Sequence, residues 1–294
     1  MSNPNQTVPA VDAHTGTATT GHEWDGIQEL NTPLPRWWLV ILYATIIWSF
    51  GYFVVYPSWP LLTSYTQGSF GWSSRGAVDA DVAAMRALRA PMNDKIVKAS
   101  LADIEKDPQL LAFARASGKA AFGDNCAPCH GAGGGGAKAY PNLNDDDWLW
   151  GGTLDQIFAT LNFGIRSGHA KGREGSMPAF GRDGLLKDAE VSQVANFVRS
   201  LSGLPAEGAF DKTAGAKIFA ENCASCHGNE GKGDQQFGAP NLTDKIWLYG
   251  ADKATIAEGV ANGRGNVMPA WQGRLEDTTI KALTVYVHTL GGGK

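Results

Sequence analysis

One five-residue pattern, Cys-x-x-Cys-His, occurs twice in this sequence of 294 residues, at 126–130 and, 97 residues later, at 223–227. This is the attachment sequence for a c-type haem. Two thiols at that spacing reach two vinyl groups on one porphyrin edge, and the adjacent histidine supplies an iron ligand. All four cysteines of the chain lie in these patterns. The sequence therefore predicts two covalently bound haem c groups, attached at Cys126, Cys129, Cys223 and Cys226, with His130 and His227 as iron ligands.

Other uses of paired cysteines need surroundings that this sequence lacks. A thioredoxin-like pair needs a βαβ context and does not require a histidine after its second cysteine. A zinc ribbon pairs two Cys-x-x-Cys knuckles about 15–20 residues apart, whereas 93 residues separate Cys129 from Cys223. The formal net charge of −4 gives no sign of nucleic-acid binding.

A long uncharged run, residues 37–56, predicts one transmembrane helix. Twenty helical residues extend about 30 Å, the thickness of the hydrocarbon core of a bilayer. Aromatic residues flank the run as they do in the interfacial belts of spanning helices. They are Trp37 and Trp38 at one end and Tyr52, Tyr56 and Trp59 at the other, where Pro57 and Pro60 end the helix.

The N-terminal segment, residues 1–36, is polar and lacks the basic start of a cleaved signal peptide. We expect residues 1–22 to be disordered and His14 and His22 to be solvated. Because c-type cytochromes are assembled outside the bacterial cytoplasm, the haem motifs indicate a cytoplasmic N-terminal segment and periplasmic haem domains. The helix is then an uncleaved, single-pass anchor in the inner membrane.

Residues 57–108 are predicted to connect the anchor to the first haem domain. Residues 57–74 carry no charge and many aromatic side chains, so we expect them at the membrane surface. Residues 79–106 have an amphipathic helical pattern that is interrupted at Pro91, with Asn93 as the N-cap of a second piece.

From about residue 109 the sequence repeats itself. The haem motifs match at an offset of 97, Pro141 and Pro240 at 99, and Met177 and Met268 at 91. The smaller offset predicts an extra eight-residue loop in the first copy. The copies are predicted as two domains, 109–203 and 208–294, each closed by a helix with an apolar stripe. The stripes comprise Val191, Val194, Ala195, Val198 and Leu201 in the first copy and Ile280, Leu283, Val287 and Leu290 in the second.

Met177 and Met268 are the candidate distal iron ligands. They are the only methionines after the haem motifs, they occupy equivalent positions, and each precedes a proline that stiffens the loop. A thioether ligand raises the reduction potential and fills the sixth position of the iron. His169 is a rival in the first copy but has no counterpart in the second.

Several other polar or turn-forming residues carry weaker expectations. We expect His288 to be solvated on the closing helix. Residues 145–147, three successive aspartates, are expected to form a solvated loop rather than a docking patch or a calcium site. Pro141 and Pro240 each follow a haem motif, and a backbone carbonyl there is expected to orient the adjacent histidine ring.

With these residues in hand, the chain resembles the dihaem subunit III of cbb3-type cytochrome c oxidases over nearly its whole length. The most specific stretch is His22-Glu23-Trp24-Asp25-Gly26-Ile27, followed by Leu30, Asn31, Pro33, Leu34, Pro35, Arg36, Trp37 and Trp38. The segments 148–152, 177–181 and 267–271 are similar to the family as well.

The resemblance implies a mainly α fold, with one transmembrane helix before two tandem class I cytochrome c domains, and His/Met ligation at both irons. It implies an electron-transfer subunit that is not catalytic alone. Its partners would be a catalytic haem–copper subunit, a monohaem cytochrome c subunit, a soluble or membrane cytochrome c donor, and the lipid membrane. The alternatives are a dihaem cytochrome of another membrane redox complex and a dihaem peroxidase, which would need an open distal position.

Overall fold

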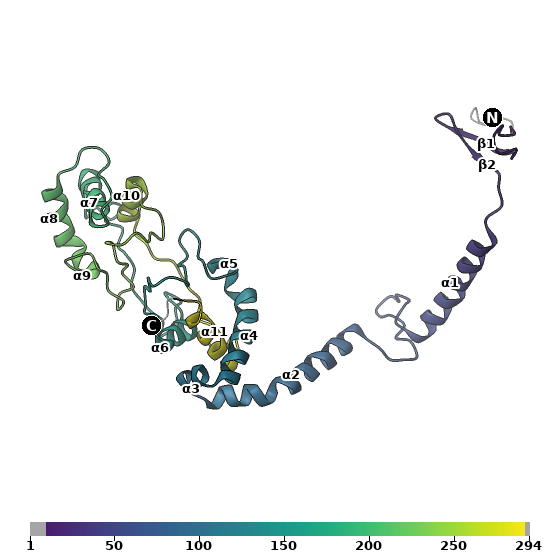
Figure 1. The fold of residues 1–294 in the computed structure, drawn as a ribbon, viewed down its shortest axis with the longest axis horizontal. Helices are drawn as coiled ribbons and strands as arrows, with labels where there is room; N and C mark the ends of the chain where they lie inside the picture. The colour runs from purple at the N-terminus through teal and green to yellow at the C-terminus, as the bar shows by residue number, and fades with distance from the viewer. Residues whose placement is uncertain (1–9, 292–294) are drawn as a thin grey trace. The chain divides into compact units, whose positions relative to one another are not determined.

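The computed structural model describes residues 10–291, which form two compact units that divide between Arg86 and Ala87. Helices are the main regular secondary structure of both units, and each unit is described by itself below. Together they contain one candidate membrane-spanning helix and the two haem motifs (Figure 1).

The first unit begins with a β-hairpin of strands β1 (Thr19–Trp24) and β2 (Ile27–Leu30). Trp24 pairs with Ile27 across a two-residue turn, in which Asp25 and Gly26 have φ values of 53° and 84°. Asp-Gly is a favoured pair for such a turn because both residues tolerate positive φ. The predicted disorder of residues 1–22 is thus wrong for residues 10–22, and residues 1–9 lie outside the described part. His14 and His22 are exposed, as predicted.

Helix α1 (Arg36–Val55) matches the predicted transmembrane segment within one residue at each end. It has a mean hydropathy of 1.9 and none of its residues is buried within the structure. Thr45 donates its hydroxyl to Leu42 O and Ser49 donates to Thr45 O, both at 2.8 Å. These bonds pair the two aliphatic hydroxyls of the helix with its own backbone, which lowers the cost of placing them in hydrocarbon.

Helix α2 (Ser74–Lys98) runs without a break through Pro91, so the predicted interruption there is wrong. Pro91 is exposed, and its ring therefore disturbs no core packing. The break comes instead at Ser100, which caps helix α3 (Leu101–Lys106) by accepting a hydrogen bond from Asp103 N. Ile96 and Ile104 are buried in a cluster with Leu110, so the end of the predicted linker belongs to the core of the second unit.

The remaining elements follow the predicted repeat. The first copy contains α4 (Pro108–Asn125), α5 (Ala127–His130), α6 (Leu154–Phe163) and α7 (Asp188–Leu201). The second contains α8 (Lys212–Asn222), α9 (Ala224–His227), α10 (Lys253–Asn262) and α11 (Asp277–His288). The apolar stripes on α7 and α11 are largely buried, as predicted.

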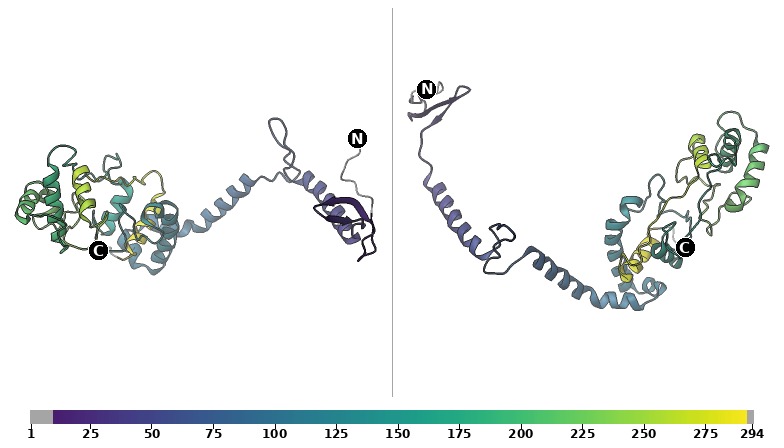
Figure 2. Two further views of the ribbon diagram at one scale, coloured as in Figure 1. Left: turned by 90° about the horizontal axis from the view of Figure 1, so that it is seen from above. Right: turned by 180° about the vertical axis from the view of Figure 1, so that it is seen from behind.

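The two copies exchange their closing helices. Helix α11, from the second copy, packs on α3, α4 and α6, and this group is called the first lobe. Helix α7, from the first copy, packs on α8 and α10 and forms with them and α9 the second lobe. Figures 1 and 2 show these two groups of helices at separate ends of the second unit. The domains predicted at 109–203 and 208–294 remain a description of the sequence repeat, and neither repeat is closed by its own last helix.

Two equivalent glycines allow the exchanged helices to approach closely. A Cβ atom on Gly118 of α4 would lie 2.3 Å from Ala282 O of α11, and one on Gly215 of α8 would lie 2.9 Å from Phe197 Cβ of α7. Gly118 and Gly215 are related by the repeat offset of 97. The same helix crossing therefore occurs in both lobes, and in each lobe the two crossing helices come from different copies.

Candidate haem sites

The first haem motif follows directly from helix α4. Cys126 ends α4 and is buried, whereas Cys129 is exposed on the four-residue helix α5. Phe122, one turn before Cys126, is buried in the same cluster and fixes the depth of the motif. The second motif repeats this arrangement, with Cys223 buried at the end of α8, beside Phe219, and Cys226 partly exposed.

Both motif histidines are oriented by a proline carbonyl, as predicted. His130 Nδ1 lies 3.0 Å from Pro141 O, and His227 Nδ1 lies 3.1 Å from Pro240 O. Burial lowers the pKa of both histidines, and the carbonyl contacts oppose this effect only in part. A neutral ring that donates through Nδ1 leaves the lone pair of Nε2 for a metal.

The buried thiols lack the lowered pKa of a redox-active pair. Burial raises the pKa of Cys126 and of Cys223 to about 11, with a smaller contribution from the second cysteine of each motif. Redox-active Cys-x-x-Cys pairs instead have a lowered pKa. A buried thiol, an exposed thiol and a neutral, oriented imidazole fit a c-type haem at each motif.

Each candidate methionine lies beside the haem motif of the other copy. Met177 packs against the cluster that contains Phe219 and Cys223, and Met268 packs against the cluster that contains Phe122 and Cys126. The repeat alone suggested one methionine and one histidine from the same copy. The structure instead places Met177 against the apolar cluster of the second motif and Met268 against that of the first, because the chain crosses between the lobes just before each methionine.

Backbone hydrogen bonds fix both crossings. Met268 N donates to Ile165 O at 3.0 Å, and Met268 O accepts from Ile165 N at 2.9 Å. Met177 N donates to Arg264 O at 2.9 Å, and Met177 O accepts from Arg264 N at 3.2 Å. Gly164 and Gly263 directly precede the partner residues Ile165 and Arg264, and they have φ values of 71° and 76°. A Cβ atom on either would lie 2.5 Å from the carbonyl oxygen of the neighbouring methionine.

The structure assigns His169 and His288 to contacts away from both motifs. His169 stacks on Phe163 at 5.1 Å, and its Nδ1 accepts from Lys171 N. His288 is not solvated as predicted: its Nδ1 lies 2.5 Å from Glu105 Oε1. Its helix turns this face toward α3, which amphipathicity within α11 alone does not reveal.

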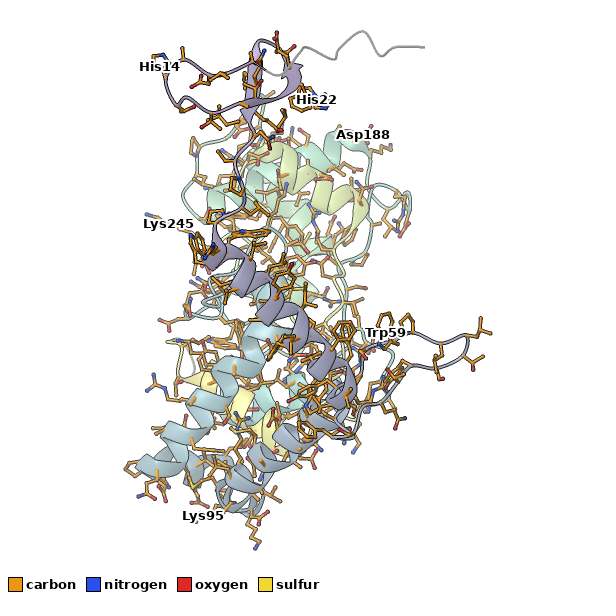
Figure 3. The ribbon with its side chains drawn as sticks, turned by 90° about the vertical axis from the view of Figure 1, so that its right-hand side faces the viewer. His14, His22, Trp59, Lys95, Asp188 and Lys245 are labelled. Carbon is orange, nitrogen blue, oxygen red and sulfur yellow. The ribbon has the colours of Figure 1, made fainter. Side chains whose placement is uncertain are left out.

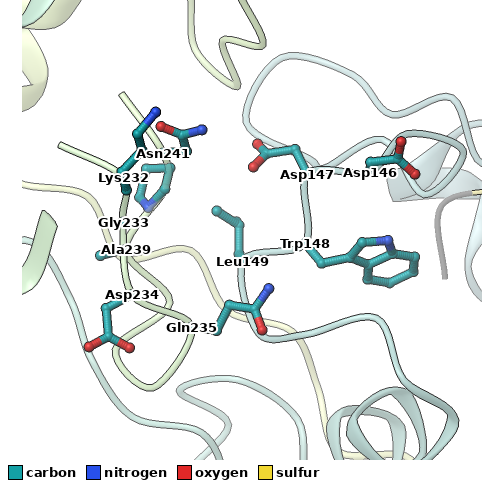
Figure 4. Close-up of a pocket in the computed structure, with 11 residues that line it drawn as sticks. Asp146, Asp147, Trp148, Leu149, Lys232, Gly233, Asp234, Gln235, Ala239 and Asn241 are labelled. Atoms are coloured by element: carbon teal, nitrogen blue, oxygen red, sulfur yellow. The ribbon is translucent and has the colours of Figure 1, made fainter. Parts of the chain in front are cut away.

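The aspartates 145–147 form only partly the solvated loop that the sequence predicts. Asp146 is exposed, but Asp147 is half-buried. Burial, with the nearby carboxylates of Asp244 and Asp145, raises the pKa of Asp147 to about 6. Asp147 lines a pocket between the loop of the first lobe and residues 232–241 of the second, next to the carbonyl that orients His227. Figure 4 shows Asp147 and Leu149 facing the segment with Lys232 and Asn241, while Trp148 turns away.

Sequence reasoning missed a pair of arginines. Arg173 lies over the Trp150 ring and donates to Gln156 O, and Arg264 lies over the Tyr249 ring and donates to Thr255 O, with both hydrogen bonds at 3.1 Å. The arginines are related by the offset of 91 that relates the methionines. Arg173 therefore follows the extra loop and occupies the position equivalent to Arg264. Extending the alignment of Met177 with Met268 by four residues toward the N-terminus would have revealed the pair.

Comparison with known families accounts for three parts of the chain. Residues 16–63 match the N-terminal domain of the cbb3-type cytochrome oxidase protein FixP. Residues 115–202 match cytochrome c, and residues 210–287 match subunit III of cbb3-type cytochrome c oxidase. The mainly helical fold, with one candidate transmembrane helix and two cytochrome c domains, is therefore confirmed.

Curated relatives match the chain almost from end to end. It is 64% identical to the cbb3-type cytochrome c oxidase subunit FixP of Bradyrhizobium sp. (strain ORS 278), over 97% of this chain and 98% of the relative. It is 63% identical to FixP of Bradyrhizobium diazoefficiens, over 96% and 98% of the two chains. The subunit CcoP of Azospirillum sp. (strain B510) is 50% identical over 96% and 98%. The chain belongs to the FixP/CcoP family, subunit III of the cbb3-type cytochrome c oxidases, and is an electron-transfer subunit.

Proposed function

We propose that the chain conducts electrons through two covalently bound haem c groups whose ligands are shared between the sequence repeats. One haem is attached at Cys126 and Cys129 and ligated by His130 and Met268. The other is attached at Cys223 and Cys226 and ligated by His227 and Met177. The observation that supports this pairing is the packing of each methionine in the cluster of the other copy's motif.

The protein's own groups would hold each haem closed to other ligands. A haem c with histidine and methionine ligands changes between ferric and ferrous states without binding a substrate. Pro141 O and Pro240 O orient the histidines. The reciprocal backbone bonds of Met177 and Met268 hold the Met-Pro segments against the apolar clusters, which exclude water from the sites. Two closed sites support a carrier that is not catalytic alone and argue against a peroxidase.

The proposed setting is a single-pass protein of the bacterial inner membrane, with a cytoplasmic N-terminal segment and periplasmic haem lobes. Electrons would enter from a soluble or membrane cytochrome c and leave toward a monohaem cytochrome c subunit and the catalytic haem–copper subunit. The uncharged residues 37–55 of helix α1 support the membrane anchor, and the attachment of c-type haems outside the cytoplasm supports this orientation.

Single-haem variants test the ligand pairing directly. In a Cys126→Ser/Cys129→Ser background only the second haem is attached, and we expect Met177→Ala to open that iron to carbon monoxide while Met268→Ala leaves it closed. In a Cys223→Ser/Cys226→Ser background the two methionines should exchange roles. Met85→Ala, at an exposed site on α2, is the control for loss of a methionine.

The opposite pattern, in which Met177→Ala opens the haem at Cys126, would show that ligands come from the same copy. Should a single-haem variant fail to fold, the two-haem Met177→Ala protein still provides an answer. In that folded protein, contacts in NMR spectra between the ring-current-shifted methyl group of Met268 and either His130 or His227 would identify the haem that keeps its methionine. Oxygen consumption by the reduced wild-type chain alone would contradict the carrier role.

A further inference from the structure

The segment that follows the transmembrane helix is folded back onto the end of that helix. Ser69 N donates to Val54 O at 2.9 Å, and Phe70 N donates to Val55 O at 3.1 Å. These carbonyls have no partner within α1, since they belong to its last turn. Gly68, with φ 75°, makes the approach possible, because a Cβ atom there would lie 2.4 Å from Val55 O. Residues 57–72 are therefore held at the membrane boundary.

Within this segment a short hairpin satisfies its own polar groups. Leu61 N donates to Ser64 O at 2.7 Å, and Thr66 N donates to Trp59 O at 3.0 Å. The hydroxyls of Ser58 and Thr66 are 3.2 Å apart and bond to each other. A backbone paired in this way can enter the polar–apolar boundary of a bilayer without leaving many donors or acceptors unsatisfied.

The tip of the hairpin carries exposed apolar side chains. Leu62 is fully exposed and Leu61 is 58% exposed, and Trp59 and Tyr65 beside them are also largely exposed. Figure 3 shows Trp59 on the loop beside the end of α1. The chain has no charged residue between Arg36 and Arg75. Apolar side chains flanked by Trp and Tyr, without charge, match the composition of a membrane interface.

We propose that Leu61 and Leu62 insert into the outer-leaflet interface and form a second, non-spanning membrane contact. This rests on the proposed orientation of the anchor. The occupant is lipid rather than a protein partner, since the backbone bonds to Val54 and Val55 keep the hairpin where the bilayer surface must be. Without a charged side chain, the contact should form with zwitterionic lipid and be insensitive to salt.

A single label tests the insertion in the full-length holoprotein. When all four native cysteines are in thioether bonds to haem, Leu61→Cys provides the only free thiol, which takes an environment-sensitive fluorophore. In phosphatidylcholine vesicles we expect blue-shifted emission that is quenched by lipids with spin labels on the acyl chain. Leu185→Cys in the second lobe is the matched control, because Leu185 is 60% exposed. A label there should report water.

A second substitution separates insertion from mere proximity. Leu62→Asp, combined with Leu61→Cys, should return the label to water, since a carboxylate is costly to bury in lipid. Equal emission from positions 61 and 185 would overturn the proposal. Protection of position 61 that appears only in the assembled oxidase would also overturn it and assign the hairpin to a partner subunit. More than one label per chain would instead indicate unattached haem, a failure of the proposed function rather than of this contact.

Discussion

Ile165 and Met268 exchange two backbone hydrogen bonds, of 2.9 and 3.0 Å, although they lie in different copies of the sequence repeat. Met177 and Arg264 form the equivalent pair in the other direction. Each candidate distal ligand is therefore positioned by a strand-like contact with the copy that does not contain it. This contact, rather than sequence proximity, holds each methionine against the apolar cluster of the other copy's motif.

Gly164→Ala should displace Met268 and open the first haem to carbon monoxide. The new Cβ would lie 2.5 Å from Met268 O, and the substitution also strains a φ of +71°. We expect a loss of about 2–4 kcal/mol in the free energy of unfolding. Gly184→Ala is the matched control, because its φ is +73° but nothing lies within 4 Å of the new atom. That variant should lose about 1 kcal/mol and keep both irons closed. Equal losses in the two variants would refute a role for the contact.

A fragment of residues 174–266 should fold alone with one haem. It contains Met177, the second haem motif and all four helices of the second lobe, α7 to α10. A fragment of residues 208–294, the second sequence repeat, lacks α7 and Met177 and should not form a closed haem site. Both can be exported with a cleavable signal and compared by haem spectra and thermal unfolding. A stable, low-spin 208–294 fragment would contradict the exchange.

Lys281→Met should loosen the end of helix α2. Lys281 Nζ donates to Ile96 O, Val97 O and Ala99 O at 3.1, 2.8 and 2.7 Å. Loss of a cation from these terminal carbonyls should cost about 1–2 kcal/mol and speed amide exchange in residues 96–100. Lys217→Met is the control, because Lys217 makes only an exposed pair with Glu221. No difference between these variants would mean that the apolar cluster alone holds the helix end.

Asp147→Asn should stabilise the protein at neutral pH. The pKa of Asp147 is raised in the folded state to about 6, chiefly by burial. Its favourable contribution is complete below the unfolded pKa of about 3.9 and is lost as the pH rises through about 6. After allowance for solvent screening, we expect a gain of about 1 kcal/mol at pH 7.5 that shrinks toward pH 5. Thermal unfolding across this range, with the exposed Asp146→Asn as control, provides the measurement. A gain that does not change with pH would exclude this cause.

The sequence predicted features that depend on local patterns. The haem motifs, the transmembrane helix, the orienting carbonyls of Pro141 and Pro240 and the apolar stripes of α7 and α11 all follow from spacing or periodicity. Periodicity shows which face of a helix is buried but not which partner buries it. Because Gly118 and Gly215 provide equivalent surfaces for a crossing helix, the sequence does not reveal which closing helix packs on which copy. The exchange therefore could not be deduced from the repeat.

Other differences arise from contacts between distant segments. His288 has Glu105 as a partner only after α11 has packed beside α3. Asp147 is affected by Asp244 only where the two lobes meet. Two further differences are local. The polar composition of the N-terminal segment suggested disorder, although Asp25-Gly26 is a typical hairpin turn. Pro91 suggested a break, although the helical pattern continues on both sides of it.

The exchange of closing helices has a consequence for the order of biogenesis. In the proposed orientation the part of the chain after α1 would be exported in order of sequence, so the first motif would emerge early, yet its lobe would lack α11 and Met268 until the end of synthesis. The second lobe, built from a continuous stretch, has all its parts sooner. The haem that is attached first would therefore acquire its distal ligand last, and a nascent chain interrupted before α11 would carry one finished and one reactive iron.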